Sequence, residues 1–337
     1  MAHEPITVSF TALQESPELL GDALERALGP SGLGVVIVND LPPSFQPLRE
    51  RMFHMAYRLA NLPAEVQDTL SRADTSYLFG WSHGKELMNG VPDTQKGSFY
   101  ANPLIDLPEV PDALRSRHPE YYSGNVWPTG IDGLEEFETT FKSLGRLVFD
   151  VGCALARACE AFVPQASRVK TIEELISSSQ CNKARLLHYY PITGTGADST
   201  NDALCGTHLD HSLLTGLCSA LYLSETPSGD VKATHPPASS GLFIFPRGER
   251  SRPVQVHIPP DCLAFQTGEA LQVLTGGRLV ATPHFVSGKA PTAGAPVSRE
   301  TFAFFLQPDV DAVIGADGET FGRFTKRVLD RHYASEG

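Results

Sequence analysis

The chain lacks the features that mark several protein classes. Its six cysteines include no C-x-x-C pair, which argues against a zinc knuckle or a redox dithiol. No stretch approaches 18 consecutive apolar residues, and no basic segment followed by an apolar run opens the chain, so we expect neither a membrane span nor a signal peptide. A reducing, cytoplasmic location is therefore the prediction.

Basic residues are also scarce. The chain has 27 Lys and Arg against 39 Asp and Glu, for a net charge of -12. Such an excess of negative charge opposes binding to a phosphate backbone or to an anionic membrane surface. We expect no nucleic-acid or membrane partner, and a monomer or a weak homo-oligomer.

The remaining composition is that of a folded globular protein. The 337 residues are 41% hydrophobic and 20% charged, and a chain of this length forms one large domain or two. We divide it into residues 1–133, a mixed α/β region with loops that cover a pocket, and residues 134–337. The second part is expected to hold a long helix, a β-rich core and a C-terminal helix.

Hydrophobic periodicity predicts the elements of this second part. Phe137, Phe141, Leu144 and Val148 recur at steps of three and four, which is typical of one long amphipathic helix over 134–163. Short apolar runs separated by turns follow and predict eight strands of a sandwich or barrel. These runs cover 184–190, 217–223, 242–245, 254–258, 262–265, 271–274, 279–286 and 301–306.

Three residues of the strand-rich half have the chemistry of metal ligands. His208 and Asp210 are two apart, so on a strand both would point to the same face. His284 lies in another expected strand. Two imidazoles and one carboxylate leave metal positions open for other ligands, as in non-haem Fe(II) oxygenases. The H-x-D triplet alone would equally suit a surface turn.

A second group of residues suits a carboxylate ligand. Arg299 and Thr301 share a face of the last expected strand, and a buried guanidinium needs an anion, which its planar fork binds bidentately. The simpler alternative is an arginine at the strand mouth that reaches water. His188 and Tyr190 share a face of the strand at 184–190, and Tyr190 would add a hydrogen bond to the same anion. Arg185 is expected on the opposite face.

The order of these motifs resembles a known family. H-Y-Y-P at 188–191, H-L-D at 208–210, G-E-A-L-Q-V-L-T-G-G-R-L-V-A-T-P-H at 268–284 and R-E-T at 299–301 resemble the isopenicillin N synthase-like branch of the 2-oxoglutarate/Fe(II)-dependent dioxygenase superfamily. The resemblance spans residues 5–330 and is strongest over 183–308. It implies a mainly β fold with flanking helices. Its core would be a double-stranded β-helix (a cupin-like jelly roll), with a mixed α/β N-terminal region and a long backing helix.

The resemblance also implies roles for individual residues. Its iron ligands would be His208, Asp210 and His284. The residues implied to bind the co-substrate, 2-oxoglutarate, are Arg299, Thr301, Tyr190 and His188. His188 departs from the usual Asn, Thr301 from the usual Ser, and Phe285 from the Arg that commonly follows the distal His.

Loops over the barrel mouth contact the substrate in the resembled family. The corresponding segments here place Phe79, Trp81, Phe99 and Asn102 as candidate substrate contacts. The alternative for these side chains is ordinary packing of aromatic and polar groups beneath a loop.

The function implied is a non-haem Fe(II)/2-oxoglutarate-dependent dioxygenase. It would use O2 to hydroxylate, desaturate or cyclise a small-molecule metabolite, with succinate and CO2 as co-products. Two alternatives stay open. One is a 2-oxoglutarate-independent Fe(II) oxidase, as isopenicillin N synthase and 1-aminocyclopropane-1-carboxylate oxidase are, in which Arg299 would hold the substrate's own carboxylate. The other is a non-catalytic binding protein.

Overall fold

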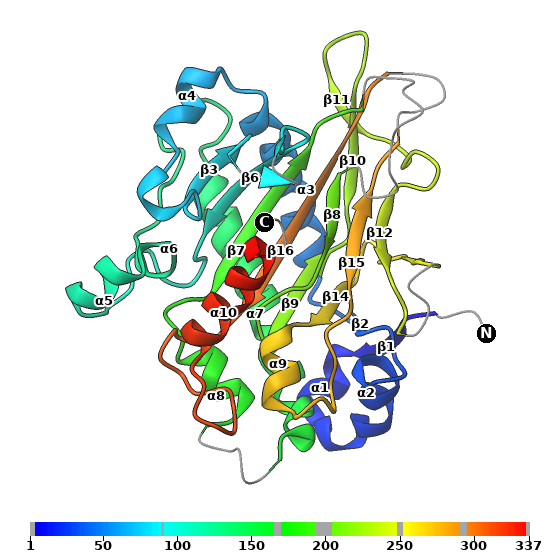
Figure 1. The fold of residues 1–337 in the computed structure, drawn as a ribbon. Coiled ribbons are helices and arrows are strands. Elements are labelled where there is room, and N and C mark those ends of the chain that lie inside the picture. The colour runs from blue at the N-terminus through cyan, green and yellow to red at the C-terminus, as the bar shows by residue number, and fades with distance from the viewer. Residues whose placement is uncertain are drawn as a thin grey trace.

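A computed structural model describes residues 4–85, 87–88, 91–164, 170–192, 204–247, 252–289 and 295–334. Two β-sheets face each other, and helices cover the outer face of the larger sheet (Figure 1). This is the mainly β architecture with flanking helices and a jelly-roll core that the sequence predicts.

The N-terminal elements alternate between helix and strand. They are β1 (Ile6–Ser9), α1 (Phe10–Glu15), η1 (Pro17–Leu20), α2 (Gly21–Leu28), β2 (Val35–Asn39), α3 (Phe45–Ala60) and α4 (Ala64–Thr69). The Ser9 hydroxyl accepts a hydrogen bond from the backbone N–H of Ala12 and so caps α1. β1 and β2 pair in parallel, and β2 joins the large sheet through β14.

The segment from 72 to 133 carries more regular structure than its sequence suggests. It forms η2 (Ala73–Thr75), β3 (Gly80–His83), β4 (Leu87–Met88), β5 (Val91–Pro92), β6 (Lys96–Ala101), α5 (Asp112–Arg117) and α6 (Pro119–Tyr122). All six residues of β6 are buried, so the strand has no alternation of apolar and polar residues by which it could be recognised. β6 pairs with β7 on one side and with β3 on the other, so β6 and β3 extend the large sheet beyond β7.

The long amphipathic helix is present as α7 (Phe137–Cys159), and η3 (Glu160–Phe162) and α8 (Ile172–Ser177) follow it. Its apolar stripe packs on the large sheet. Val148 lies against the sheet where Gly216 and Phe265 leave room for the helix. The predicted helix over 134–163 is therefore confirmed, and its amphipathic face has the expected role.

The small sheet and the remaining strands of the large sheet come from the second half of the chain. These strands are β7 (Lys183–Tyr189), β8 (Cys205–His208), β9 (Leu214–Cys218), β10 (Leu221–Glu225), β11 (Val231–Ala233), β12 (Gly241–Ile244), β13 (Val254–Val256), β14 (Leu263–Thr267), β15 (His284–Ser287) and β16 (Val297–Leu306). The small sheet has the order β13-β12-β15-β8. The large sheet runs β1-β2-β14-β9-β16-β7-β6-β3, and β10 and β11 extend from β16.

Two local predictions are wrong. The apolar run at 271–274 belongs to the helix α9 (Glu269–Leu274), because a run this short fits a buried helix as well as a strand. Asp210 lies two residues beyond the end of β8 rather than on the strand. The final helix, α10 (Phe321–Ala334), is where it was expected.

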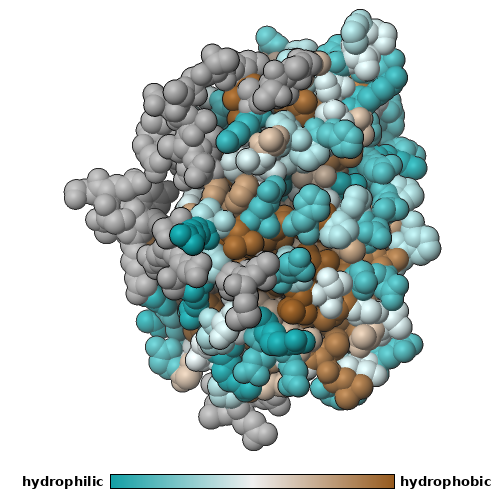
Figure 2. Space-filling view, turned by 90° about the vertical axis from the view of Figure 1, so that its right-hand side faces the viewer, coloured by the Kyte–Doolittle hydropathy of each residue, from teal (hydrophilic) through white to brown (hydrophobic). Residues whose placement is uncertain are grey.

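The space between the sheets is lined by apolar side chains. Its core cluster contains Leu33, Val35, Ile37, Leu242, Ile244, Val256, Cys262 and Ala264. Figure 2 shows the side of the molecule on which the small sheet lies, where hydrophobic side chains gather between hydrophilic ones. Within the described ranges no helix is both long and apolar enough to span a membrane. The division at 133/134 stays a prediction.

Candidate metal centre and cavity

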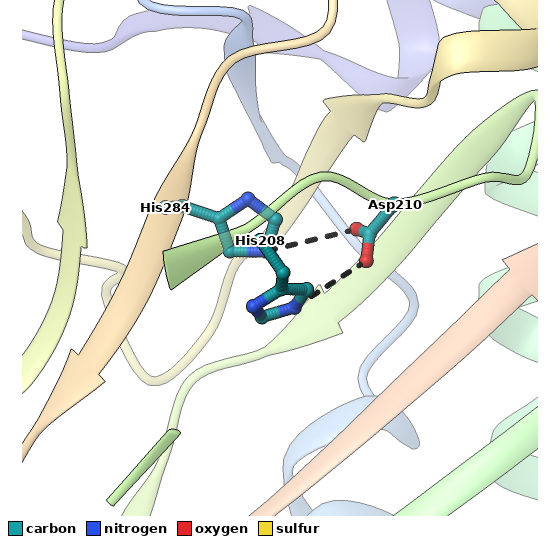
Figure 3. A group of neighbouring side chains, drawn as sticks. All are labelled: His208, Asp210 and His284. Atoms are coloured by element: carbon teal, nitrogen blue, oxygen red, sulfur yellow. Dashed lines mark ion pairs between the residues drawn. The ribbon is translucent and has the colours of Figure 1, made fainter. Parts of the chain in front are cut away.

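Three side chains from separate points of the chain converge between the sheets. His208 ends β8, His284 begins β15, and these two residues are directly paired across the two strands. The Nε2 atoms of His208 and His284 lie 3.8 Å and 3.9 Å from the two carboxylate oxygens of Asp210 (Figure 3). One ligand atom from each residue lies within 4.8 Å of the others, so the group can hold a metal ion.

The backbone fixes which nitrogen of each imidazole faces this point. Nδ1 of His208 lies 2.8 Å from the carbonyl oxygen of Gly206, and Nδ1 of His284 lies 3.2 Å from that of Thr282. A carbonyl accepts hydrogen bonds only, so each Nδ1 donates to it and each Nε2 is turned toward Asp210. Histidine ligands of metals are held in the same way in known metal sites. The donor set therefore fits Fe(II).

The electrostatics of the three groups are coupled. Burial alone would raise the pKa of Asp210, but His284, His208 and a hydrogen bond from Thr215 together lower it. Burial and the neighbouring His208 lower the pKa of His284 to about 4. Burial opposes the charge on His208, yet Cys205 and Asp210 raise the pKa of that imidazole to about 9.

The three residues line a cavity of about 410 Å³. Most of its wall is apolar and comes from both sheets, including Leu187, Leu217, Leu242, Val256, Val286, Ala303 and Phe305. The volume lies within the usual range for small-molecule sites, which are mostly apolar with a few polar anchors.

Arg299 is one of the cationic residues that line this cavity. It is 8% exposed, and its guanidinium carbon lies 5.0 Å from the centroid of the Tyr189 ring. Its Nε and Nη1 atoms are buried and have no hydrogen-bond partner among the described residues. Thr301 also lines the cavity, and its hydroxyl donates to the carbonyl of Cys218. The predicted direction of Arg299 and Thr301 is confirmed, and their role stays a prediction.

The predicted direction of His188 and Tyr190 is wrong. β7 pairs with β16 so that Arg299 lies opposite Tyr189, and directly opposite residues of paired strands point to the same side. The cavity side of β7 therefore carries Tyr189, Leu187 and Arg185. His188 turns to the helix side, where Nδ1 lies 2.9 Å from both carboxylate oxygens of Glu300.

Tyr190 points the same way as His188. Its hydroxyl donates to the carbonyl of Ala60 at the end of α3. The physical reason is that alternation divides a strand into two faces without saying which one lies inside. That choice depends on the register with β16.

The four candidate substrate residues lie outside the cavity. Phe79, Trp81, Phe99 and Asn102 are each at most 4% exposed, and none lines it. Phe99 packs edge-on against Phe137 of α7 at 4.9 Å between ring centroids. Asn102 accepts backbone hydrogen bonds from Leu104 and Ile105 and donates to Gln180. β6 extends the sheet beside β7, and these four side chains take part in packing and in backbone hydrogen bonds, with Phe99 against α7.

Several polar residues of the cavity were not predicted as site residues, among them Tyr189, Arg185 and Gln266. Arg185 was expected on the face of β7 opposite His188, and Tyr189 was not considered. Ser98 accepts hydrogen bonds from Arg185 at 2.8 Å and 3.0 Å, which holds that guanidinium in place. Gln266 directly follows the apolar run at 262–265. A polar residue at the end of an expected buried strand was the sequence feature that could have marked it as a site residue.

Comparison with known proteins identifies the fold. No protein-family model matches the chain, and no curated protein matches it in sequence. A Caulobacter crescentus protein of the 2OG-Fe(II) oxygenase family superposes with a TM-score of 0.70 at 20% identity, over 97% of this chain and 99% of that one. The chain has the fold of these oxygenases.

Two further structures share the oxygenase fold. The full-length Neurospora crassa T7H, in complex with α-ketoglutarate (2-oxoglutarate) and 5-formyluracil, gives a TM-score of 0.59 at 17% identity over 91% of this chain and 85% of that one. Dioxygenase for auxin oxidation 1 from Arabidopsis thaliana, in a binary complex with 2-oxoglutarate, gives 0.58 at 18% identity over 92% and 94%.

Proposed function

We propose that this protein is a non-haem Fe(II)/2-oxoglutarate-dependent dioxygenase that oxidises a small-molecule metabolite. The observation that carries the proposal is the joint presence of two imidazoles, one carboxylate and a buried arginine with unpartnered N–H groups in one cavity. Neither the metal-ligand set nor the arginine alone would distinguish this function from a structural metal site or a strand-end arginine.

His208, Asp210 and His284 would hold the ferrous ion. When bound there, iron would supply the activation of O2, which no side chain provides. The imidazoles are oriented by their Nδ1 hydrogen bonds, and the apolar walls limit the entry of water. The protein's own contribution is thus to position its ligands and to keep the cavity dry.

Arg299 would bind the far carboxylate of 2-oxoglutarate. Its Nε and Nη1 atoms have no hydrogen-bond partner among the described residues, so the guanidinium is free to donate to a carboxylate, and burial makes such a charge-assisted hydrogen bond strong. The tyrosine at this site is Tyr189, which stacks beneath the guanidinium, rather than Tyr190. Thr301 would contribute its hydroxyl oxygen beside the same carboxylate.

The structural neighbours support 2-oxoglutarate over the alternative of an oxidase that does not use it. The solved neighbours named above include two complexes with this co-substrate. Those neighbours also act on or bind small molecules, which agrees with a metabolite substrate here. The narrower assignment to the isopenicillin N synthase-like branch rests on the order of the sequence motifs, and a reducing compartment agrees with six free cysteines.

Anaerobic titration tests the proposal. Addition of Fe(II) and then 2-oxoglutarate should give a visible charge-transfer band, and admission of O2 should convert 2-oxoglutarate to succinate. His284→Ala should lose both signals, whereas His257→Ala at the cavity mouth should keep them. Iron binding without the band would favour the 2-oxoglutarate-independent oxidase. A band without any succinate would favour the binding protein.

A further inference from the structure

Gln266 is a buried polar residue that the proposed chemistry does not use. It lies on β14, is 2% exposed and lines the cavity. Its Oε1 atom is buried and has no hydrogen-bond partner among the described residues. A buried acceptor without a partner is costly, so a site that retains one is built to receive a donor from a ligand.

The position of Gln266 is close to the metal ligands. It pairs across the sheet with Thr215 of β9, and the Thr215 hydroxyl hydrogen-bonds to Asp210. Three residues further on, the backbone N–H of Glu269 donates to the carbonyl of Asp210. The side chain of Gln266 therefore belongs to the part of the cavity where a bound molecule would approach the metal.

No described residue donates a hydrogen bond to Oε1 of Gln266. The Thr215 hydroxyl is engaged with the carboxylate of Asp210, and Ser212 Oγ lies 2.9 Å from the same hydroxyl oxygen. The inward neighbours on β2 and β14 are apolar, Val35 and Ala264. The missing donor must come from the contents of the cavity.

The co-substrate cannot be that donor. At neutral pH 2-oxoglutarate carries two carboxylates and a ketone, all of which accept hydrogen bonds and none of which donates. The donor groups of Arg299 and the acceptor atom of Gln266 therefore suit two different ligands. The N–H groups of Arg299 suit the co-substrate, and the Oε1 atom of Gln266 suits the substrate.

We propose that Gln266 determines substrate specificity by accepting a hydrogen bond from a neutral small molecule that bears a secondary amide or ring lactam. A primary amide side chain presents one acceptor beside two donors, and the complement of that pair is an N–H group next to a carbonyl. A carboxylate in the same place would put an acceptor oxygen of the ligand against Oε1 of Gln266, which is also an acceptor. This proposal rests on the proposed function, because it assigns Arg299 to the co-substrate.

The test uses probes that differ only in the N–H group. 2-Piperidone and uracil are compared with N-methyl-2-piperidone and 1,3-dimethyluracil, and cyclohexanecarboxylate serves as the acidic probe. Binding is measured anaerobically as the change in the charge-transfer band of the Fe(II)/2-oxoglutarate protein. We expect the N–H probes to bind at least about tenfold more tightly than their methylated partners, because an unmatched buried acceptor has a large penalty.

Gln266→Leu should reduce this preference to within about twofold, since an apolar side chain of similar size no longer requires a donor. Gln255→Leu is the matched control, because Gln255 lines the same cavity but donates to the carbonyl of Ser240. It should keep the preference. The affinity of Gln266→Leu for 2-oxoglutarate should stay within about twofold of wild type, because the co-substrate has no hydrogen to donate.

The melting temperature distinguishes a role of Gln266 in substrate binding from a role in holding the fold together. Replacing an unpartnered amide by an apolar group should leave the melting temperature unchanged or raise it. A lower melting temperature with weaker binding of every probe would overturn the proposal. Gln266→Met, with an unbranched side chain, repeats the test if the leucine variant does not fold.

Other results would also contradict the inference. Wild-type protein that prefers the methylated or acidic probes, or an N–H preference that survives in Gln266→Leu, would do so. Failure of the proposed function looks different, because wild-type protein would then give no charge-transfer band. The same probe pairs would in that case be scored on the metal-free protein by ligand-observed NMR.

Discussion

Under the proposed function, Arg299 binds the far carboxylate of the co-substrate. Arg299→Ala should weaken the binding of 2-oxoglutarate by about 10- to 100-fold, because hydrogen bonds between charged groups contribute about 1.5–3 kcal/mol. Fe(II) binding should be retained, since no metal ligand changes. Titration of the charge-transfer band measures both, and Arg49→Ala is the control. Arg49 also lines the cavity but donates to the carbonyls of Ser219 and Ala220.

A second prediction at the residue scale concerns the buried Lys183 and the pH dependence of stability. Its ammonium donates to the carbonyl of Leu78 and lies 3.8 Å from the centroid of the Phe79 ring. Burial lowers the pKa of Lys183 to about 7. In the unfolded chain a lysine keeps its proton to about pH 10.4, so between these values the unfolded state binds more protons. The free energy of unfolding should therefore rise with pH over this window.

Lys183→Met should flatten that rise by up to about 1.4 kcal/mol per pH unit, the value for one proton. Urea unfolding at several pH values between 7 and 10 measures the slope. Lys232→Met, in the exposed part of β11, should leave the slope unchanged. Equal slopes in wild type and Lys183→Met would show that the buried lysine keeps its proton.

At the scale of elements, the contact between α7 and the large sheet depends on glycine. A Cβ atom on Gly216 of β9 would lie 2.6 Å from Cγ1 of Val148 and 2.9 Å from Cε1 of Phe265. Gly216→Ala should therefore destabilise the protein by about 1–3 kcal/mol, as overpacking of a core does.

Chemical unfolding checks this, with Gly21→Ala as the matched substitution. A Cβ atom on Gly21 would meet nothing within 4 Å, and the residue has a helical φ of -50°. That variant should be neutral or slightly more stable. Similar losses in both variants would mean that α7 does not pack as closely as described.

The elements also show where prediction from sequence ended. Alternation in β7 separated His188 and Tyr190 from Arg185 and Tyr189 correctly. It assigned the wrong set to the cavity. The face that lies inside is decided by the pairing of Tyr189 with Arg299, which is 110 residues further along the chain. β3 and β6 escaped prediction for a related reason, since strands buried on both faces carry no periodic signal.

At the scale of the whole molecule, the bound ligands should link the two sheets. His208 and His284 belong to the small sheet, whereas Arg299 belongs to the large one. Mn(II), a redox-stable substitute for Fe(II), should stabilise the fold together with 2-oxoglutarate. At a hundredfold excess over the dissociation constant the gain is about 2.7 kcal/mol.

A rise in melting temperature that EDTA reverses measures this effect. His284→Ala should lose the metal-dependent rise, and His257→Ala should keep it. An unchanged melting temperature in wild-type protein with Mn(II) and 2-oxoglutarate would contradict the placement of the ligands on both sheets.

The sequence by itself determined the chemistry of the centre. His208, Asp210, His284 and Arg299 stand in short motifs whose residue types indicate metal and carboxylate binding, and the β-rich pattern around them predicted a sandwich or barrel. Only the tertiary structure decided which face of β7 lines the cavity, that Phe99 of β6 packs against α7, and that Gln266 lines the same cavity as Asp210. Motifs and periodicity are properties of neighbouring residues, whereas register and packing depend on contacts between distant ones.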